Sequence, residues 1–143
     1  MKVMIVDDSR AMRTILSRML RRAGATEILE AGDGKQAVEL LSTSMDMPEL
    51  AIVDWNMPVM NGLELVMELR QRAGWRGIAI VMCTTENEHS QVVRALAAGA
   101  HEYVIKPFDE PALLGKLAIL GFGFPEALDG PQPATNPEGG TQS

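Results

Sequence analysis

The chain has 143 residues, of which 46% are hydrophobic and 22% are charged, and its formal net charge is −6 at pH 7. This length is typical of one domain with its own core. The single cysteine excludes a disulfide within the chain, and no apolar run is long enough for a signal peptide or a membrane span. We therefore expect a cytoplasmic protein that does not insert into membranes, and the lack of a basic cluster argues against nucleic-acid binding.

Five short runs rich in β-branched residues predict buried strands. In chain order they are Val3–Val6, Thr26–Leu29, Leu50–Val53, Ile78–Met82 and Tyr103–Ile105. The first, third and fourth runs are apolar throughout, which is typical of a parallel sheet that is covered by helices on both faces.

A helical spacing of apolar residues follows each predicted strand. The five apolar stripes are Met12, Ile15, Leu16, Met19 and Leu20; Ala37, Val38, Leu40 and Leu41; Leu65, Val66 and Leu69; Val93, Leu96 and Ala97; and Leu113, Leu114, Leu117 and Leu120. Gly24, Gly74 and Gly99 stand where the first, third and fourth helices are expected to end.

Strict alternation of strands and helices predicts an α/β domain over residues 1–120. We expect a flavodoxin-like (βα)5 doubly wound fold, with a five-stranded parallel sheet in the order 2-1-3-4-5 and helices on both faces. Residues 121–143 hold half of the prolines and no lysine or arginine. We interpret them as a flexible Pro/Gly-rich tail, with the alternative that Phe122, Phe124 and Leu128 pack back onto the domain.

Polar residues stand at the ends of four of the predicted strands. Asp7 and Asp8 follow the first strand, Asp54 the third, Thr84 the fourth and Lys106 the fifth. Ligands of an open parallel sheet bind beyond the carboxyl ends of its strands, where the strand order reverses. If strands one and three are neighbours, three carboxylates converge there. They stay ionised together only around a cation, and an all-oxygen donor set selects Mg²⁺ or Mn²⁺.

This combination of groups is suited to phosphoryl transfer. Magnesium sites are often completed by a phosphate oxygen, which Lys106 and the Thr84 hydroxyl could also bind. A carboxylate in such surroundings can accept a phosphoryl group. Simpler roles exist for each residue alone: a helix cap for Asp8 or Thr84, a turn at Asp54 or at Asn61-Gly62, and a surface position for Lys106. Their joint position at strand ends of one sheet favours the site.

These residues, together with Met57-Pro58 and Gly62, resemble the receiver domain of two-component response regulators over roughly residues 2–120. Within that family, the run DWNMP is similar to the single-domain chemotaxis regulators of the CheY type. The resemblance implies that Asp54 is the phosphoacceptor, and that Mg²⁺ is held by Asp7, Asp8, Asp54 and the Asn56 carbonyl. It also implies that Thr84 and Lys106 bind the phosphate and that the Lys106–Pro107 peptide is cis.

The resemblance further implies how the protein would signal. It is not a conventional enzyme but catalyses its own phosphorylation, from a histidine kinase, and its own dephosphorylation, which Asn56 and Glu86 tune. Thr84 and Tyr103 form the switch, and a downstream target docks on the face made by the fourth helix, the fifth strand and the fifth helix. A phosphatase is a further candidate partner. Thr85 departs from the family pattern, which usually has a smaller residue after the switch threonine.

Four other functions fit parts of the pattern. A phosphorelay intermediate would keep the same site. A pseudo-receiver, which only binds proteins, usually lacks an acidic residue, the threonine or the lysine, and none is lost here. A flavin protein needs a hydroxyl- and glycine-rich loop where this chain has Asp-Asp-Ser-Arg. A phosphatase with an aspartate nucleophile carries its acids close together in one loop, whereas Trp55-Asn56 follows Asp54.

Overall fold

The computed structural model describes residues 1–85 and 89–122. Its helices and strands, in chain order, are β1 (Lys2–Val6), α1 (Arg10–Arg22), β2 (Glu27–Ala31), α2 (Gly34–Thr43), β3 (Leu50–Asp54), α3 (Gly62–Gln71), the short 3-10 helix η1 (Ala73–Trp75), β4 (Ala79–Thr85), α4 (His89–Ala98), β5 (Glu102–Lys106) and α5 (Glu110–Ile119). All five predicted strands are present. β4 continues furthest beyond its predicted end, to Thr85.

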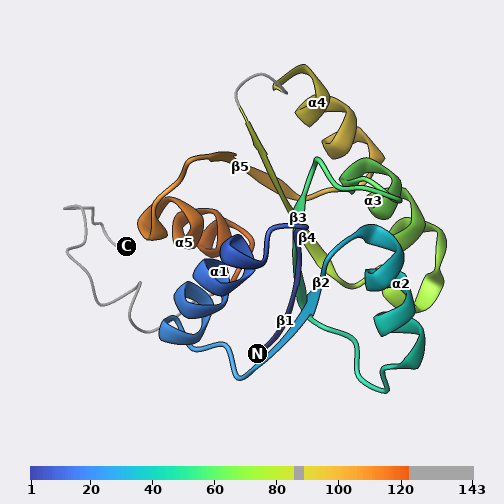
Figure 1. Cartoon of the computed structure of the whole chain (residues 1–143), viewed down its shortest axis with the longest axis horizontal. Coiled ribbons are helices and arrows are strands. Elements are labelled where there is room, and N and C mark those ends of the chain that lie inside the picture. Colours follow the sequence, from blue (N-terminus) through green and yellow to red (C-terminus); the bar gives the residue numbers. More distant parts are fainter. Residues whose placement is uncertain (86–88, 123–143) are drawn as a thin grey trace, which may run out of the picture.

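The five strands form one parallel sheet in the order β2-β1-β3-β4-β5, which confirms the predicted topology. Figure 1 shows α1 and α5 on one face of this sheet and α2, α3 and α4 on the other. None of the helices in the described ranges is long and apolar enough to cross a membrane.

Alternation along the buried strands gives each helix layer its own core. Met4 and Val6 of β1 pack toward α2, α3 and α4, whereas Val3 and Ile5 pack toward α1 and α5. Successive side chains of a strand point to opposite faces, so a strand that is apolar throughout supplies both cores at once. Burial on both faces fixes the strand ends, and thereby the residues that follow them.

The apolar stripe predicted for the fourth helix was wrong. Val93 and Leu96 of α4 are 64% and 38% exposed, whereas Val92 and Ala95 are buried. Apolar residues surround most of this short helix, so their spacing alone does not select the buried face. The packing of α4 against α3 and β4 selects it. In α1, Ile15 is likewise 46% exposed although it was placed on the buried stripe.

Two of the three glycines expected to end helices do so. Gly24 and Gly99 follow α1 and α4 with φ of +112° and +123°, values that favour glycine. The prediction for Gly74 was wrong, because α3 already ends at Gln71 and Gly74 lies within η1. Trp75, the last residue of η1, is buried and packs into the core at this point.

Candidate functional site

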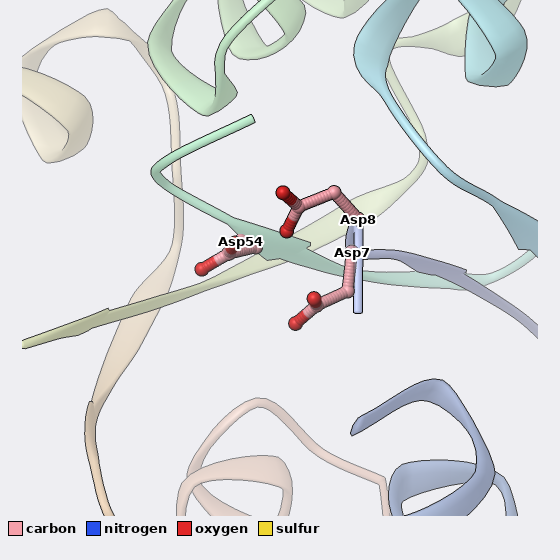
Figure 2. Close-up of side chains that lie close together, drawn as sticks. All are labelled: Asp7, Asp8 and Asp54. Atoms are coloured by element: carbon pink, nitrogen blue, oxygen red, sulfur yellow. The ribbon is translucent and has the colours of Figure 1, made fainter. Parts of the chain in front are cut away.

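Three carboxylates meet at the carboxyl edge of the sheet. Asp7 and Asp8 directly follow β1, and Asp54 is the last residue of the neighbouring strand β3. Val6 pairs with Val53, so the residues that follow these two lie side by side. An oxygen from each carboxylate lies within 4.8 Å of the others, and Figure 2 shows all three side chains extending toward the same side. The convergence predicted from the strand ends is confirmed.

Lys106 reaches this cluster from β5. Its Nζ lies 2.9 Å from Oδ1 of Asp54 and 3.2 Å from Oδ2 of Asp7, and its side chain is 20% exposed. β4 lies between β3 and β5, so the long lysine side chain spans the edge of the sheet. The Lys106–Pro107 peptide is cis, as the family resemblance implied. Lys106 is therefore part of the site and not an isolated surface lysine.

The electrostatics of the cluster leave negative charge uncompensated. Burial raises the pKa of the Asp54 carboxyl, Lys106 opposes this, and Asp7 and Asp8 raise it further. Burial lowers the pKa of Lys106, but Asp54 and Asp7 outweigh it and the net shift is upward. One ammonium group faces three carboxylates. Such an all-oxygen, acidic donor set fits a hard divalent cation such as Mg²⁺ or Mn²⁺.

The start of α1 orients Asp7. The Ser9 amide donates to Oδ1 of Asp7 at 2.8 Å, and an Arg13 guanidinium nitrogen donates to the Asp7 carbonyl at 2.6 Å. The Ser9 side chain accepts from the Met12 amide, so Ser9 caps the helix and Asp8 does not. The sequence reasoning missed Arg13. The available signal was its place one helical turn after the cap, beside the carboxylates.

The chain after Asp54 is held close to the strand by Gly62. The Gly62 amide donates to the Trp55 carbonyl at 2.9 Å. A Cβ at this position would lie 2.5 Å from the Asp54 carbonyl oxygen, so only glycine fits without displacing the backbone. Asn61 and Glu64 then begin α3 with a reciprocal capping box. The Asn61-Gly62 pair is thus a helix start and a close approach to Asp54, and not only a turn.

The loop between Asp54 and α3 contains a strained turn. The Met60 amide donates to the Pro58 carbonyl at 2.7 Å, and the residue between them, Val59, has φ of +67°. A three-residue turn of this kind is rare, and a β-branched residue in the left-handed region costs roughly 1–3 kcal/mol. Asn56 lies exposed in the same loop. The loop that carries Asn56 is thus held in a costly conformation beside the carboxylates.

The two predicted switch residues differ in burial and in their position along the strands. Thr84 is buried in β4, one residue beyond Cys83, which pairs with Asp54. Because α4 begins at His89, Thr84 is a strand residue and not the cap of that helix. Tyr103 is half-buried at the other end of β5 from Lys106, opposite Met82, and is not part of the carboxylate cluster. Glu86 lies outside the described residues.

Tyr103 contacts α5 through its ring. The ammonium group of Lys116 lies 4.5 Å from the centre of the Tyr103 ring and 3.0 Å from Oε1 of Glu102. A cation over an aromatic face is attracted by the ring quadrupole. This contact connects β5 to α5 on the surface that the resemblance assigned to partner binding.

Comparisons with known proteins agree with this geometry. The family model of the response regulator receiver domain matches residues 3–118. A chemotaxis protein CheY homolog of Campylobacter jejuni is 44% identical over 127 residues, covering 88% of this chain and 97% of its own. CheY1 of Helicobacter pylori is 43% identical over 120 residues, covering 84% and 96%. The structure of CheY4 of Vibrio cholerae matches with a TM-score of 0.75 and 34% identity, covering 83% of this chain and 97% of that one.

Proposed function

Because the chain belongs to the response regulator receiver family and is of the CheY chemotaxis type, we propose that it is a phosphorylation-switched signalling protein that accepts a phosphoryl group on Asp54. The observation that carries this proposal is the contact of Lys106 with Asp54 inside a cluster of three carboxylates. The lysine supplies positive charge at the atom where a phosphoryl group would be attached, and the cluster can hold a divalent cation beside it.

The chemistry needs an ionised Asp54. Although burial raises the pKa of this carboxyl, the hydrogen bond from Lys106 favours its charged form. A carboxylate oxygen of Asp54 would attack the phosphorus of a phosphohistidine on a sensor kinase. A phosphorus–oxygen bond forms, the phosphorus–nitrogen bond breaks, and the imidazole leaves with the bonding electron pair. Lys106 then neutralises charge on the transferred group.

Asp7, Asp8, Asp54 and the main-chain carbonyl of Asn56 would hold Mg²⁺ or Mn²⁺. When bound, this cation supplies charge neutralisation for the phosphoryl oxygens. Ser9 and Arg13 fix Asp7 by contacts to its carboxylate and its carbonyl, so the site is largely formed before a cation arrives. Asn56 and Glu86 would tune the rate at which water removes the phosphoryl group.

The output would use the surface formed by α4, β5 and α5. Thr84 would hydrogen-bond to the phosphoryl group, and the resulting movement of β4 would change the position of Tyr103. The exposed Val93 and Leu96 on α4 support a docking role, because apolar side chains on one helix face are suited to binding a partner. A bistable pair of arrangements that phosphate biases would couple the site to this face.

We further propose a cytoplasmic location, a receiver domain over residues 1–120, and a C-terminal tail over residues 121–143. A sensor histidine kinase would be the phosphoryl donor, a downstream target protein would dock on the α4-β5-α5 surface, and a phosphatase would be a further partner.

The test of the proposed function uses a small acyl phosphate as donor. Wild-type protein is incubated with acetyl phosphate and Mg²⁺, the adduct is trapped by reduction, and the modified residue is mapped by mass spectrometry. We expect one modification, at Asp54, and none in Asp54→Asn. The matched control, Asp46→Asn, changes an exposed aspartate outside the cluster and should be modified as wild type is. Modification at Asp7 or Asp8 would refute the assignment, and no modification of wild type would favour the pseudo-receiver.

A further inference from the structure

A groove lies at the amino-terminal edge of the sheet, opposite the carboxylate cluster. It has a volume of about 550 Å³, and its wall includes Met47, Pro48, Ile78, His101, Leu120 and Phe122. These residues precede β3, β4 and β5 or follow α5. The wall also includes Glu49, Ala79, Gly74 and Gly77, and a Cβ at either glycine would meet no atom within 4 Å. The groove therefore has open space beside a wall that is mostly apolar.

The end of α5 turns the chain into this groove. Leu120 is the C-cap residue of α5, and Gly121 follows with φ of +94°. The Phe122 amide donates to the Leu117 carbonyl at 2.9 Å, and the Gly121 amide donates to the Ala118 carbonyl at 3.0 Å. These two bonds form a Schellman motif, which reverses the chain direction at a helix end. Phe122 consequently packs against the core under α1 and α5 while it lines the groove.

The chain that continues from Phe122 has the composition to fill the groove. Residues 123–128 read GFPEAL, with Phe124 two positions after Phe122. A residue before proline is biased to an extended conformation, and side chains two positions apart in an extended chain share one face. An extended chain spans roughly 7 Å over two residues, so in that conformation the Phe124 side chain would reach the same side of the chain as that of Phe122. The 21 residues from 123 to 143 supply more than enough chain, and Phe124 carries the first apolar side chain among them.

We propose that residues 123–128 bind in this groove within the same molecule, with Phe124 as the buried side chain. The groove and the carboxylate cluster are at opposite edges of the sheet, so this contact leaves the cluster open. A segment bound there would lie beside the residues that precede β3, β4 and β5. This interaction is independent of the proposed phosphorylation.

The test compares amide spectra of the full-length chain with and without the aromatic side chain. In ¹H–¹⁵N spectra we expect Phe124→Ser to shift the amides of Gly74, Gly77 and Ile78, because a docked ring perturbs the resonances beside it. The control Gln132→Ser changes a residue of the same tail beyond the segment and should leave these amides in place. If the three amides do not move in Phe124→Ser, or if the shifts fall on other elements, the proposal is wrong.

A dilution series distinguishes binding within one molecule from binding between two copies. For binding within the molecule, the positions of the three amides in the wild-type spectrum do not depend on protein concentration. Shifts that approach those of Phe124→Ser on dilution would show that a second copy fills the groove, which would overturn the proposal. Both variants change residues outside the packed cores, so the fold is expected to persist in each.

Discussion

Two partly buried, positively charged side chains lie at opposite edges of the same sheet, and their hydrogen-bond partners differ. Lys106, at the carboxyl edge, contacts the carboxylates of Asp54 and Asp7. Arg70, at the amino edge, donates to the carbonyls of Gly99, Arg76 and Ile78 at 3.1, 2.6 and 2.7 Å. Its guanidinium group therefore joins the end of α3 to the segments that precede β4 and β5.

The two clusters have opposite charge balances. The three carbonyl acceptors of Arg70 are neutral, and the packing is so close that a Cβ on Gly99 would lie 2.6 Å from Cγ of Arg70. Around Lys106, three carboxylates leave negative charge uncompensated. A cation whose donors are met by backbone carbonyls stabilises the fold, whereas a cluster with excess charge is suited to binding an ion. This difference indicates that the amino edge around Arg70, called the structural edge below, stabilises the fold. The carboxyl edge around Lys106, called the ligand-binding edge, is suited to binding a ligand.

The largest effect is expected at the structural edge. Arg70→Met should lower the free energy of unfolding by about 3 kcal/mol, because hydrogen bonds from a charged donor contribute roughly 1.5–3 kcal/mol each and the carbonyls lose their partner. The measurement is urea unfolding followed by Trp fluorescence. Affinity for Mg²⁺ should not change.

Arg72→Met is the matched control for this prediction. Arg72 lies on the surface, where it pairs with Glu68 and stacks on Trp75. Exposed ion pairs typically contribute less than about 1 kcal/mol, so its loss should be small. Equal losses of stability in the two variants would contradict the structural role assigned to Arg70.

At the ligand-binding edge we expect a substitution to weaken Mg²⁺ binding without destabilising the fold. Asp8→Asn should weaken Mg²⁺ binding by at least about 10-fold, equivalent to about 1.4 kcal/mol, because it removes one of the proposed charged ligands. The fold should be as stable as wild type or more so, since a like charge leaves the cluster. Isothermal titration with MgCl₂ measures the affinity, with Glu39→Gln on the surface of α2 as the control. Unchanged affinity in Asp8→Asn would remove Asp8 from the site.

A smaller effect concerns pH at the structural edge. Nδ1 of His101 accepts from the Ile80 amide at 3.0 Å and lies 3.4 Å from an Arg70 nitrogen. Burial, followed by the charge of Arg70, lowers the pKa of His101 below its ordinary 6.5. The folded state thus binds the proton less readily than the unfolded state, so stability is complete above pH 6.5 and falls as the pH drops below it.

His101→Asn isolates this contribution. Asparagine keeps a hydrogen-bond acceptor near the Ile80 amide but does not titrate. Between pH 7.5 and 5.5 the wild type should lose more stability than the variant, measured by urea unfolding at each pH. Parallel pH profiles for the two proteins would show that His101 does not titrate against Arg70.

The smallest effect is expected at Cys83, which pairs with Asp54 beneath the carboxylate cluster. Burial raises the pKa of this thiol to about 12, so almost no thiolate forms at neutral pH. Native protein at pH 8 should resist iodoacetamide, and urea-unfolded protein should react fully, as mass spectrometry can measure. Rapid alkylation of the native protein would mean that the sheet edge beneath Asp54 opens in solution.

Much of the fold and of the site could be predicted because both depend on where strands begin and end. The apolar runs of β1, β3 and β4 specify a sheet buried on both faces, and a parallel sheet brings its carboxyl ends to one edge. Asp7, Asp8, Asp54 and Lys106 are therefore neighbours in space by topology. The sequence determined this convergence without any knowledge of side-chain contacts.

Only the tertiary structure decided how these elements pack. Apolar residues surround α4, so its contact with α3 selected Val92 and Ala95 for burial and left Val93 and Leu96 exposed. Arg70 of α3 donates to backbone carbonyls of the segments that precede β4 and β5, and nothing in the local sequence around Arg70 indicates these partners. Such bonds depend on distances between residues far apart in the chain. Local periodicity carries no information about these distances, and so the structural edge was visible only in the folded molecule.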